Sequence, residues 1–289
     1  MIVVTGASGQ LGRLVVTDLL KKLPAREIAL VARSPEKVAD FAALGVQVRQ
    51  GDYDQPDTLV SAFSGADKLL LISANEVGRR FAQHSAAIAA AKQAGVGQLV
   101  YTSLLHADSS PLPLCAEHVQ TETLIRASGI PYVILRNGWY TENYLAGIDS
   151  ALQLGAVFGS AGEGRIASAA RGDYAEAAAA VLTQEHHTGR VYELAGDESY
   201  SLAEFAAEIA LHSGKKIVYQ NLPEADFKAA LVSAGLPQWL ATLLAESDVG
   251  ASKGGLFDNS HQLSELIGRP TTSWKTQIKN LVDVQNLAH

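Results

Sequence analysis

Three glycines near the start of the chain have the spacing of a phosphate-binding turn. The stretch "VVTGASGQLGRLVV" places Gly6, Gly9 and Gly12 in a G-x-x-G-x-x-G pattern between a β-branched run and an apolar helical run. The first glycine permits a sharp turn, the second lets a pyrophosphate approach the backbone, and the third lets the helix pack closely against the sheet. Helical N–H groups and the helix dipole then face the phosphates. We therefore expect a dinucleotide site formed by Gly6, Ala7, Ser8, Gly9, Gln10, Leu11 and Gly12.

The end of the second expected strand favours a phosphorylated dinucleotide. An NAD site usually has an acidic residue about twenty residues beyond the glycines, where it binds the ribose of adenosine. This chain has Arg33 there, in "VARSPEK", and Lys37 lies one turn further on. A guanidinium can bind a 2′-phosphate through two hydrogen bonds, so NADPH is expected to bind better than NADH. The alternatives are a glycine turn that binds no ligand and an Arg33 that is a solvated surface residue.

An alternation of short β-branched runs and helical runs positions these motifs. It predicts a parallel sheet covered by helices on both faces, because the strands are apolar almost throughout. This is the pattern of a Rossmann-type, doubly wound α/β fold. Strands are expected at residues 2–5, 27–33, 46–49, 68–73, 98–103 and 131–136, and helices at 11–22, 35–44, 56–63 and 81–94.

The pattern becomes looser after residue 136. We expect helices at 141–154, 173–185 and 201–214, a strand at 190–196 and mostly short helices beyond. Ser201 and Glu204 have the spacing of a capping box at the start of the third of these helices. We assign residues 1–140 to the Rossmann core, with later segments near 165–200 returning to it. Residues 141–289 then form mainly a smaller α/β substrate lobe.

One stretch of the expected lobe, residues 247–260 ("SDVGASKGGLFDNS"), is rich in glycine and serine. No strand precedes it, so it does not match a P-loop. We interpret it as a mobile loop of the substrate lobe, in which Lys253 could close over the substrate.

Composition excludes several classes of protein. A formal net charge of −7, without a basic cluster, argues against a nucleic-acid surface. Cys115 is the only cysteine, so no internal disulfide can form, which suits the cytoplasm. No apolar run is long enough to predict a membrane span, and the scattered histidines predict no metal site. A homodimer is compatible with the sequence.

Six segments together resemble the NmrA-like atypical short-chain dehydrogenase/reductases, over essentially the whole chain. They read "TGASGQLG", "VAR", "GDYDQP", "LLLIS", "YTSLLHAD" and "LRNGWYTENY", of which the last is the most specific. Within that family, the chain is similar to the bacterial NAD(P)H:quinone oxidoreductases and also to the triphenylmethane reductases.

The resemblance implies a role for the residues that follow several strands, where open α/β sheets bind ligands. Asp52 and Tyr53 would lie beside the adenine, although Asp52 could equally be a turn residue and Ser73 a helix cap. The implied cofactor residues are Asp52, Tyr53, Ser73, Ala74, Asn75, Thr102, Ser103, Asn137, Gly138, Trp139, Tyr140, Thr141 and Glu142, and Asn143 and Tyr144 would face the substrate.

The chain lacks the Tyr-x-x-x-Lys pair that most of the wider superfamily carries after the fifth strand. The helix expected there reads "CAEHVQTETLIRASG" and contains neither residue type. Reducing a ketone produces an alkoxide that needs a nearby acid, whereas a reduced quinone can take its proton from water. His118, with Glu122 one turn away, could act as an acid, although a helix-surface pair is the alternative. Tyr140 is a second candidate, although it could instead form an aromatic wall.

These observations together predict an NADPH-dependent reductase that transfers a hydride directly to quinones, without a flavin. The rings of Trp139, Tyr140 and Tyr144 suit a flat aromatic acceptor. Two alternatives remain open. One is a redox sensor that binds NADP(H) without turnover and regulates a partner protein, and the other is a reductase of another acceptor, such as a triphenylmethane dye.

Overall fold

A computed structural model describes residues 1–287 of the chain. The chain forms two compact units. The first comprises Met1–Asp108, Leu114–Asn137 and Arg171–Glu193, and the second comprises the remaining described residues. The division differs from the expected boundaries, because residues 109–113 and 138–140 belong to the second unit. The segment of the later chain that returns to the first unit is Arg171–Glu193.

The first unit is built around a seven-stranded sheet. The strand order β3-β2-β1-β4-β5-β6-β8 confirms the doubly wound α/β fold, since it reverses direction next to β1. The pairs β1–β2, β1–β4, β2–β3, β4–β5 and β5–β6 are parallel. The strands are β1 (Ile2–Val4), β2 (Ile28–Ala32), β3 (Gln47–Gln50), β4 (Lys68–Leu71), β5 (Gln98–Leu104), β6 (Tyr132–Asn137) and β8 (Val191–Leu194).

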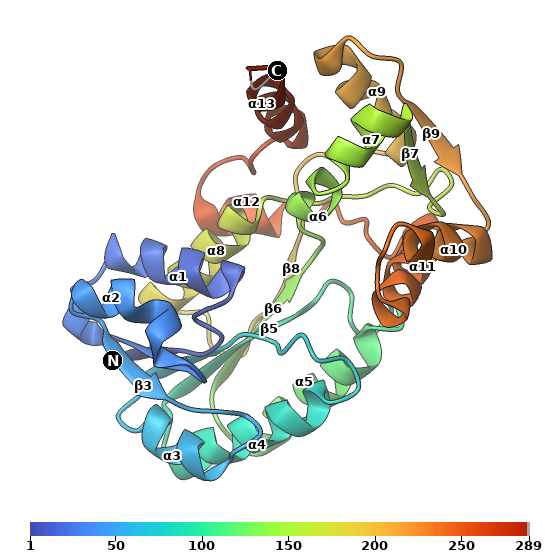
Figure 1. The fold of residues 1–289 in the computed structure, drawn as a ribbon. Helices are drawn as coiled ribbons and strands as arrows, with labels where there is room; N and C mark the ends of the chain where they lie inside the picture. Colours follow the sequence, from blue (N-terminus) through green and yellow to red (C-terminus); the bar gives the residue numbers. More distant parts are fainter. Residues whose placement is uncertain (288–289) are drawn as a thin grey trace. The chain divides into compact units, whose positions relative to one another are not determined.

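Helices cover both faces of this sheet, with α1 and α8 on one side and α3, α4 and α5 on the other (Figure 1). The helices of the first unit are α1 (Gln10–Leu20), α2 (Ala39–Ala43), α3 (Asp57–Phe63), α4 (Arg80–Gln93), α5 (Cys115–Ser128) and α8 (Arg171–Thr183). The helix expected at 35–44 begins as a 3-10 turn, Pro35–Val38, before α2.

The core of the first unit explains why its strands read as continuous apolar runs. Every residue of β2 and of β5 is buried, as expected for strands covered on both faces. On the face covered by α3 and α4, Leu59 and Phe63 join Ile88, Leu99 and Tyr101 in one apolar cluster. This packing fixes the carboxyl ends of the strands, which carry most of the expected cofactor residues.

The second unit contains a small sheet that the sequence did not indicate. Its two strands, β7 (Ala156–Gly159) and β9 (Val218–Asn221), are parallel and lie side by side (Figure 1). The helix expected at 141–154 is interrupted at residues 146–147. The helices are α6 (Thr141–Leu145), α7 (Ile148–Leu154), α9 (Leu202–Ser213), α10 (Glu224–Ser233), α11 (Gln238–Ser252), α12 (Gln262–Ile267) and α13 (Trp274–Leu287).

Two further expectations for this unit have clear outcomes. The capping box of α9 is confirmed, because the Glu204 N–H donates to the Ser201 hydroxyl at 3.2 Å and the Ser201 N–H donates to the Glu204 carboxylate at 2.8 Å. The interpretation of residues 247–260 as a loop is wrong for Ser247–Ser252, which complete α11. Among residues 1–287, no helix has the length and apolar character needed to cross a membrane.

Candidate functional site

The turn between β1 and α1 has the geometry expected of a pyrophosphate site. Gly6 has a φ of +61°, and its carbonyl accepts from the Gly9 N–H at 3.0 Å. A Cβ on Gly12 would lie 2.3 Å from that same carbonyl oxygen, so only glycine allows α1 to start so close to the turn. No side chain caps α1, and its first turn contains no acidic residue. The positive end of this helix therefore fits an anionic group.

Arg33 lies directly after β2, in the position expected of a 2′-phosphate ligand. Its side chain is 64% exposed, and its guanidinium reaches the Glu76 carboxylate at 3.5 Å. Glu76 also accepts from Arg79 at 2.9 Å. Because an exposed ion pair of this length is weak, a phosphate can compete with Glu76 for the guanidinium.

The residues expected beside the adenine follow β3. The Asp52 carboxylate accepts from the Asp54 N–H at 3.0 Å, which is the turn role that the sequence left open. The side chain of Tyr53 is half-buried and packs against the apolar cluster of the first unit. Burial raises the pKa of Tyr53, so its hydroxyl stays protonated.

The ends of β4 and β5 are joined by side chains. The Thr102 hydroxyl accepts from the Ser73 N–H at 2.9 Å, so Thr102 fixes the segment that follows β4. The hydroxyl of Ser103 donates to Glu122 at 2.6 Å. The structure therefore brings the expected residues Ser73, Ala74, Thr102 and Ser103 to one edge of the sheet, while Asn75 is exposed beside them.

Asn137 ends β6 and has an unsatisfied polar atom. Its side chain is 5% exposed, and its Oδ1 is buried without a hydrogen-bond partner among the described residues. A buried acceptor without a donor is costly and rare in proteins. An amide N–H of a ligand, such as the carboxamide of a nicotinamide, would satisfy it.

The residues that follow Asn137 along the chain belong to the second unit. Thr141 is fully buried, its N–H donates to the Ala169 carbonyl at 2.9 Å, and its hydroxyl is 2.9 Å from that of Ser168. The Gly138 N–H donates to the Leu194 carbonyl at 2.8 Å, and Trp139 and Tyr140 are half-buried. Hydrogen bonds thus fix the backbone of the expected wall, Gly138–Glu142.

Comparison with known proteins decides the family. Residues 6–185 match the model of a family described as NAD(P)H-binding. The chain belongs to the NAD(P)H-binding family. It is 55% identical over 286 residues to quinone oxidoreductase 2 of Escherichia coli, a match that covers 99% of this chain and 100% of that protein.

Solved structures of two similar proteins contain or use the same cofactor. The structure of an E. coli NADPH-dependent quinone oxidoreductase complexed with NADPH matches with a TM-score of 0.96 and 56% identity, covering 97% of this chain and 99% of the other. The triphenylmethane reductase of Citrobacter sp., complexed with NADP(H), matches with a TM-score of 0.94 and 39% identity, covering 97% and 100%. The cofactor class expected from the glycine turn is thereby confirmed.

His118 of this NAD(P)H-binding protein does not form the expected surface pair with Glu122. Both side chains are buried, and His118 Nδ1 lies within hydrogen-bond distance of the Tyr101 hydroxyl, at 2.7 Å. Glu122 instead binds Arg136 and Ser103. Burial and the charge of Arg80 lower the pKa of His118 to about 3. His118 is therefore a neutral imidazole at neutral pH, which is a far weaker acid than an imidazolium, so the structure does not favour that role.

Tyr144 belongs to an aromatic cluster of the second unit. Its ring packs edge-on against Tyr200, with centroids 6.1 Å apart, and lies tilted against Phe205, with centroids 5.9 Å apart. Burial raises the pKa of Tyr144 well above its usual value, so the hydroxyl stays protonated. Of the other two expected substrate residues, Asn143 is exposed on α6 and Lys253 is exposed directly after α11.

Asp248, on α11, is a buried acid that sequence reasoning missed. Its carboxylate accepts from the Ser160 N–H at 2.8 Å, and it faces Tyr144 and Tyr219. Burial raises its pKa to about 6. The sequence signal was the glycine-rich stretch 247–260, but a lone aspartate there looks like a solvated loop residue.

This raised pKa predicts a pH-dependent effect of Asp248→Asn. A carboxyl with a raised folded-state pKa stabilises the fold below its unfolded pKa of 3.8, and that contribution is lost as pH rises through about 6. Asparagine keeps an acceptor for Ser160 and carries no charge. We expect the variant to be more stable than the wild type by about 1–3 kcal/mol at pH 8 and by less at pH 5. Urea unfolding at both pH values measures this, and an equal difference at both would contradict it.

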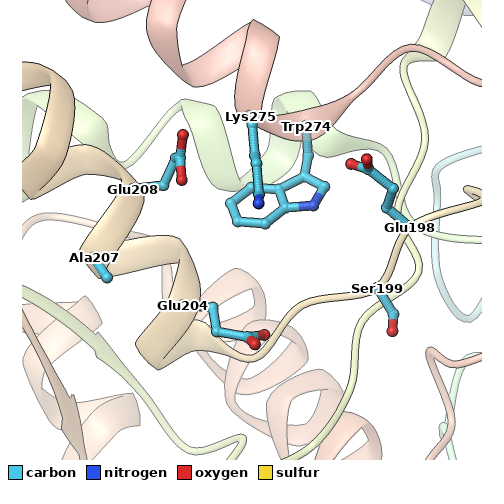
Figure 2. Close-up of a pocket in the computed structure, with 7 residues that line it drawn as sticks. All are labelled: Glu198, Ser199, Glu204, Ala207, Glu208, Trp274 and Lys275. Carbon is cyan, nitrogen blue, oxygen red and sulfur yellow. The ribbon is translucent and has the colours of Figure 1, made fainter.

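A pocket of about 500 Å³ lies elsewhere in the second unit, under the start of α13. Figure 2 shows the Trp274 ring with Glu198 and Glu208 on either side of it in this view. The carboxylates already have partners, since Glu204 binds Arg165 and Glu208 binds His212. None of the expected site residues lines it. The lining residues are Glu198, Ser199, Glu204, Ala207, Glu208, Trp274 and Lys275.

Proposed function

We propose that this chain is an NADPH-dependent reductase that transfers a hydride to quinones without a flavin. The observation that carries the proposal is the 55% identity to quinone oxidoreductase 2 across both chains. The uncapped start of α1 and the exposed Arg33 support NADPH as the cofactor. The absence of Tyr-x-x-x-Lys from α5 fits an acceptor that needs no protein acid.

Each part of the proposed site has a distinct task. The N–H groups of the Gly6–Gly12 turn bind the pyrophosphate, and Arg33 binds the 2′-phosphate. Asn137 accepts from the nicotinamide carboxamide. NADPH supplies the hydride, and the quinone takes one proton to become a hydroquinone. The other proposed contacts are Asp52, Tyr53, Ser73, Ala74, Asn75, Thr102, Ser103 and Gly138–Glu142 for the cofactor, and Asn143, Tyr144 and Lys253 for the acceptor.

Orientation rather than acid–base chemistry then provides most of the rate. Holding a flat acceptor against the reduced nicotinamide shortens the hydride path, and water can protonate the stabilised hydroquinone oxygen. Tyr140 is the remaining protein candidate for a proton donor. A Tyr140→Phe variant that keeps full turnover at every pH would assign the proton to water.

The test is NADPH oxidation followed at the nicotinamide absorbance, with 1,4-benzoquinone as acceptor. A reaction without enzyme corrects for the direct reaction of quinone with NADPH. We expect quinone-dependent turnover, much slower with NADH. Tight NADPH binding without turnover on any acceptor would instead favour a redox sensor, and a partner protein should then co-purify with the chain.

A triphenylmethane dye belongs in the same assay. The 39% identical Citrobacter structure is a triphenylmethane reductase, so a cationic dye is a second candidate acceptor. The ratio of kcat/KM for benzoquinone and for the dye decides between the two acceptors.

Localisation and assembly are also part of the proposal. Because the sequence has a single cysteine, Cys115, and therefore no internal disulfide, we place the reaction in the cytoplasm. We propose a homodimer as the assembly.

Arg33→Ala is expected to change cofactor preference. Loss of the guanidinium removes charge-assisted hydrogen bonds to the 2′-phosphate, which NADH lacks. We expect the KM for NADPH to rise about 10- to 100-fold and that for NADH by less than about threefold. Arg79→Ala is the matched control, because Arg79 is equally exposed and also binds Glu76. An equal rise for both cofactors in Arg33→Ala would refute the phosphate assignment.

A further inference from the structure

Side chains, rather than a neighbouring strand, hold the backbone that follows β4. The Ile72 N–H donates to the Thr5 hydroxyl at 3.1 Å, and the Ser73 N–H donates to the Thr102 hydroxyl at 2.9 Å. Thr5 directly follows β1 and Thr102 lies in β5, and these two strands flank β4 in the sheet. The segment therefore continues the direction of β4 beyond its last residue, without a strand partner of its own.

The next residue, Ala74, is held at both of its backbone polar groups by α4. The Ala74 N–H donates to His84 Nε2 at 2.9 Å, and the Ala74 carbonyl accepts from Arg80 Nε at 2.6 Å. His84 is 0% exposed and Arg80 is 7% exposed. Since these residues lie one helical turn apart, α4 presents one acceptor and one donor at the spacing that a single residue's backbone requires.

The hydrogen bonds of His84 define its protonation. Because Nε2 accepts from Ala74, the ring proton lies on Nδ1, which is 3.0 Å from the Thr121 hydroxyl. Thr121 in turn donates to the Glu117 carbonyl at 2.8 Å. Burial and the nearby Arg80 lower the pKa of His84 to about 3, so the imidazole remains a neutral acceptor at physiological pH.

Glu117 of α5 holds the start of α4. Its carboxylate accepts from the Gly78 N–H at 3.1 Å and from the Phe81 N–H at 3.2 Å, and it lies 3.7 Å from Arg80. Side-chain hydrogen bonds thus hold the connection from β4 to α4 at Ile72–Ala74 and again at Gly78–Phe81. These contacts are not needed to build the sheet, because every residue of β4 already pairs with β5.

We propose that His84 and Arg80 are positioning residues for NADPH, which hold the Ala74 peptide so that Ser73–Asn75 presents a preformed surface to the cofactor. This inference rests on the proposed function, in which these three residues contact NADPH. A preformed surface avoids the entropic cost of ordering the segment on binding. Loss of the hydrogen bonds from His84 and Arg80 to Ala74 should therefore weaken NADPH binding and leave kcat at saturating NADPH nearly unchanged.

Two substitutions of His84 separate positioning from packing. In His84→Gln, the side-chain amide oxygen can reach the place of Nε2 and accept from Ala74, whereas in His84→Asn the shorter side chain reaches only the place of Nδ1. We expect the Kd for NADPH, measured by titration, to rise about tenfold in His84→Asn and less than about threefold in His84→Gln. Amide exchange of Ala74 in the protein without NADPH should accelerate only in His84→Asn.

The outcomes are distinguishable. Equal losses of affinity in both variants, in proportion to a fall in Tm, would mean that His84 only packs the core and would overturn the proposal, as would unchanged affinity in His84→Asn. Should both variants fail to fold, Arg80→Lys keeps the charge beside Glu117 but removes the Nε donor, and an unchanged Kd there would overturn it. A wild type that does not bind NADPH would refute the proposed function instead, while the exchange of the Ala74 amide would still test the contact.

Discussion

Arg136→Met is expected to lower the free energy of unfolding by about 3–5 kcal/mol, because it removes the cation that binds both oxygens of the buried Glu122 carboxylate and leaves that carboxylate a longer contact, 3.2 Å, with Arg126. The Arg136 guanidinium donates to both oxygens of Glu122, at 2.9 and 2.8 Å, and to Glu193 at 2.8 Å. Arg136 and Glu122 are both almost fully buried. Methionine fills a similar volume but gives these acids no hydrogen bond.

The loss of stability in Arg136→Met should depend on pH. Burial acts to raise the pKa of Glu122, but hydrogen bonds from Arg136 and Ser103 overcome it, so the folded-state pKa lies below the usual value. The stabilisation is therefore present above the unfolded pKa and is lost as pH falls through the folded pKa. Without Arg136, burial dominates and Glu122 binds a proton more readily. We expect the variant to be closer to the wild type at pH 5 than at pH 8.

Urea unfolding at both pH values measures this prediction. Arg165→Met is the matched control, since Arg165 and its partner Glu204 are both exposed, and its loss should cost less than about 1 kcal/mol. The double variant with Glu122→Met should recover part of the loss, because two apolar side chains leave one fewer buried charge unpaired. Equal stability losses in Arg136→Met and Arg165→Met would contradict the assignment of a buried network.

Gly12→Ala is expected to abolish measurable NADPH binding, with a loss of about 100-fold or more. The added methyl group would lie 2.3 Å from the Gly6 carbonyl oxygen and 2.8 Å from Ala7 Cα, and neither backbone atom can rotate away. The turn must move as a unit, which displaces the N–H groups that we propose bind the pyrophosphate. Overpacking of this kind also costs about 1–3 kcal/mol of stability.

Gly172→Ala is the matched control for this substitution. Gly172 also lies in the first turn of a helix of the first unit, but a Cβ there meets no atom within 4 Å. Alanine should be neutral or stabilise α8 by up to about 1 kcal/mol, since it is the better helix former. Calorimetric titration with NADPH and thermal unfolding compare the two variants. Retention of wild-type affinity in Gly12→Ala would show that the turn does not bind the cofactor.

The sequence predicted those parts of the fold whose signals are local. Buried parallel strands such as β2 and β5 are apolar along their whole length, and the Ser201–Glu204 cap lies within one turn of α9. The small sheet of the second unit was missed because β9 is polar and mostly exposed, so only its pairing with β7 makes it a strand.

The candidate site likewise contains residues with a local sequence signal and residues without one. The Gly6–Gly12 turn and Arg33 follow from spacing alone, whereas His84 and Asp248 acquire their roles from partners far along the chain. His84 accepts a hydrogen bond from a backbone N–H ten residues away, and Asp248 accepts one from a backbone N–H 88 residues away. A buried acid or imidazole with distant partners has the same local sequence as a solvated one, so its environment could not be read from the sequence.

The return of Arg171–Glu193 to the first unit has a consequence for folding during synthesis. When the ribosome has made residues 1–137, β6 is an open edge and α1 lacks the helix that covers it, because β8 and α8 are not yet translated. The nascent sheet must keep that edge unpaired until β8 begins at Val191, more than fifty residues later, a window in which edge-to-edge association is a hazard. A fragment that stops near residue 140 lacks β8 and α8, so its β6 edge stays unpaired and the fragment should aggregate. A fragment that continues through residue 193 contains all seven strands of the sheet and lacks only Leu194, the last residue of β8.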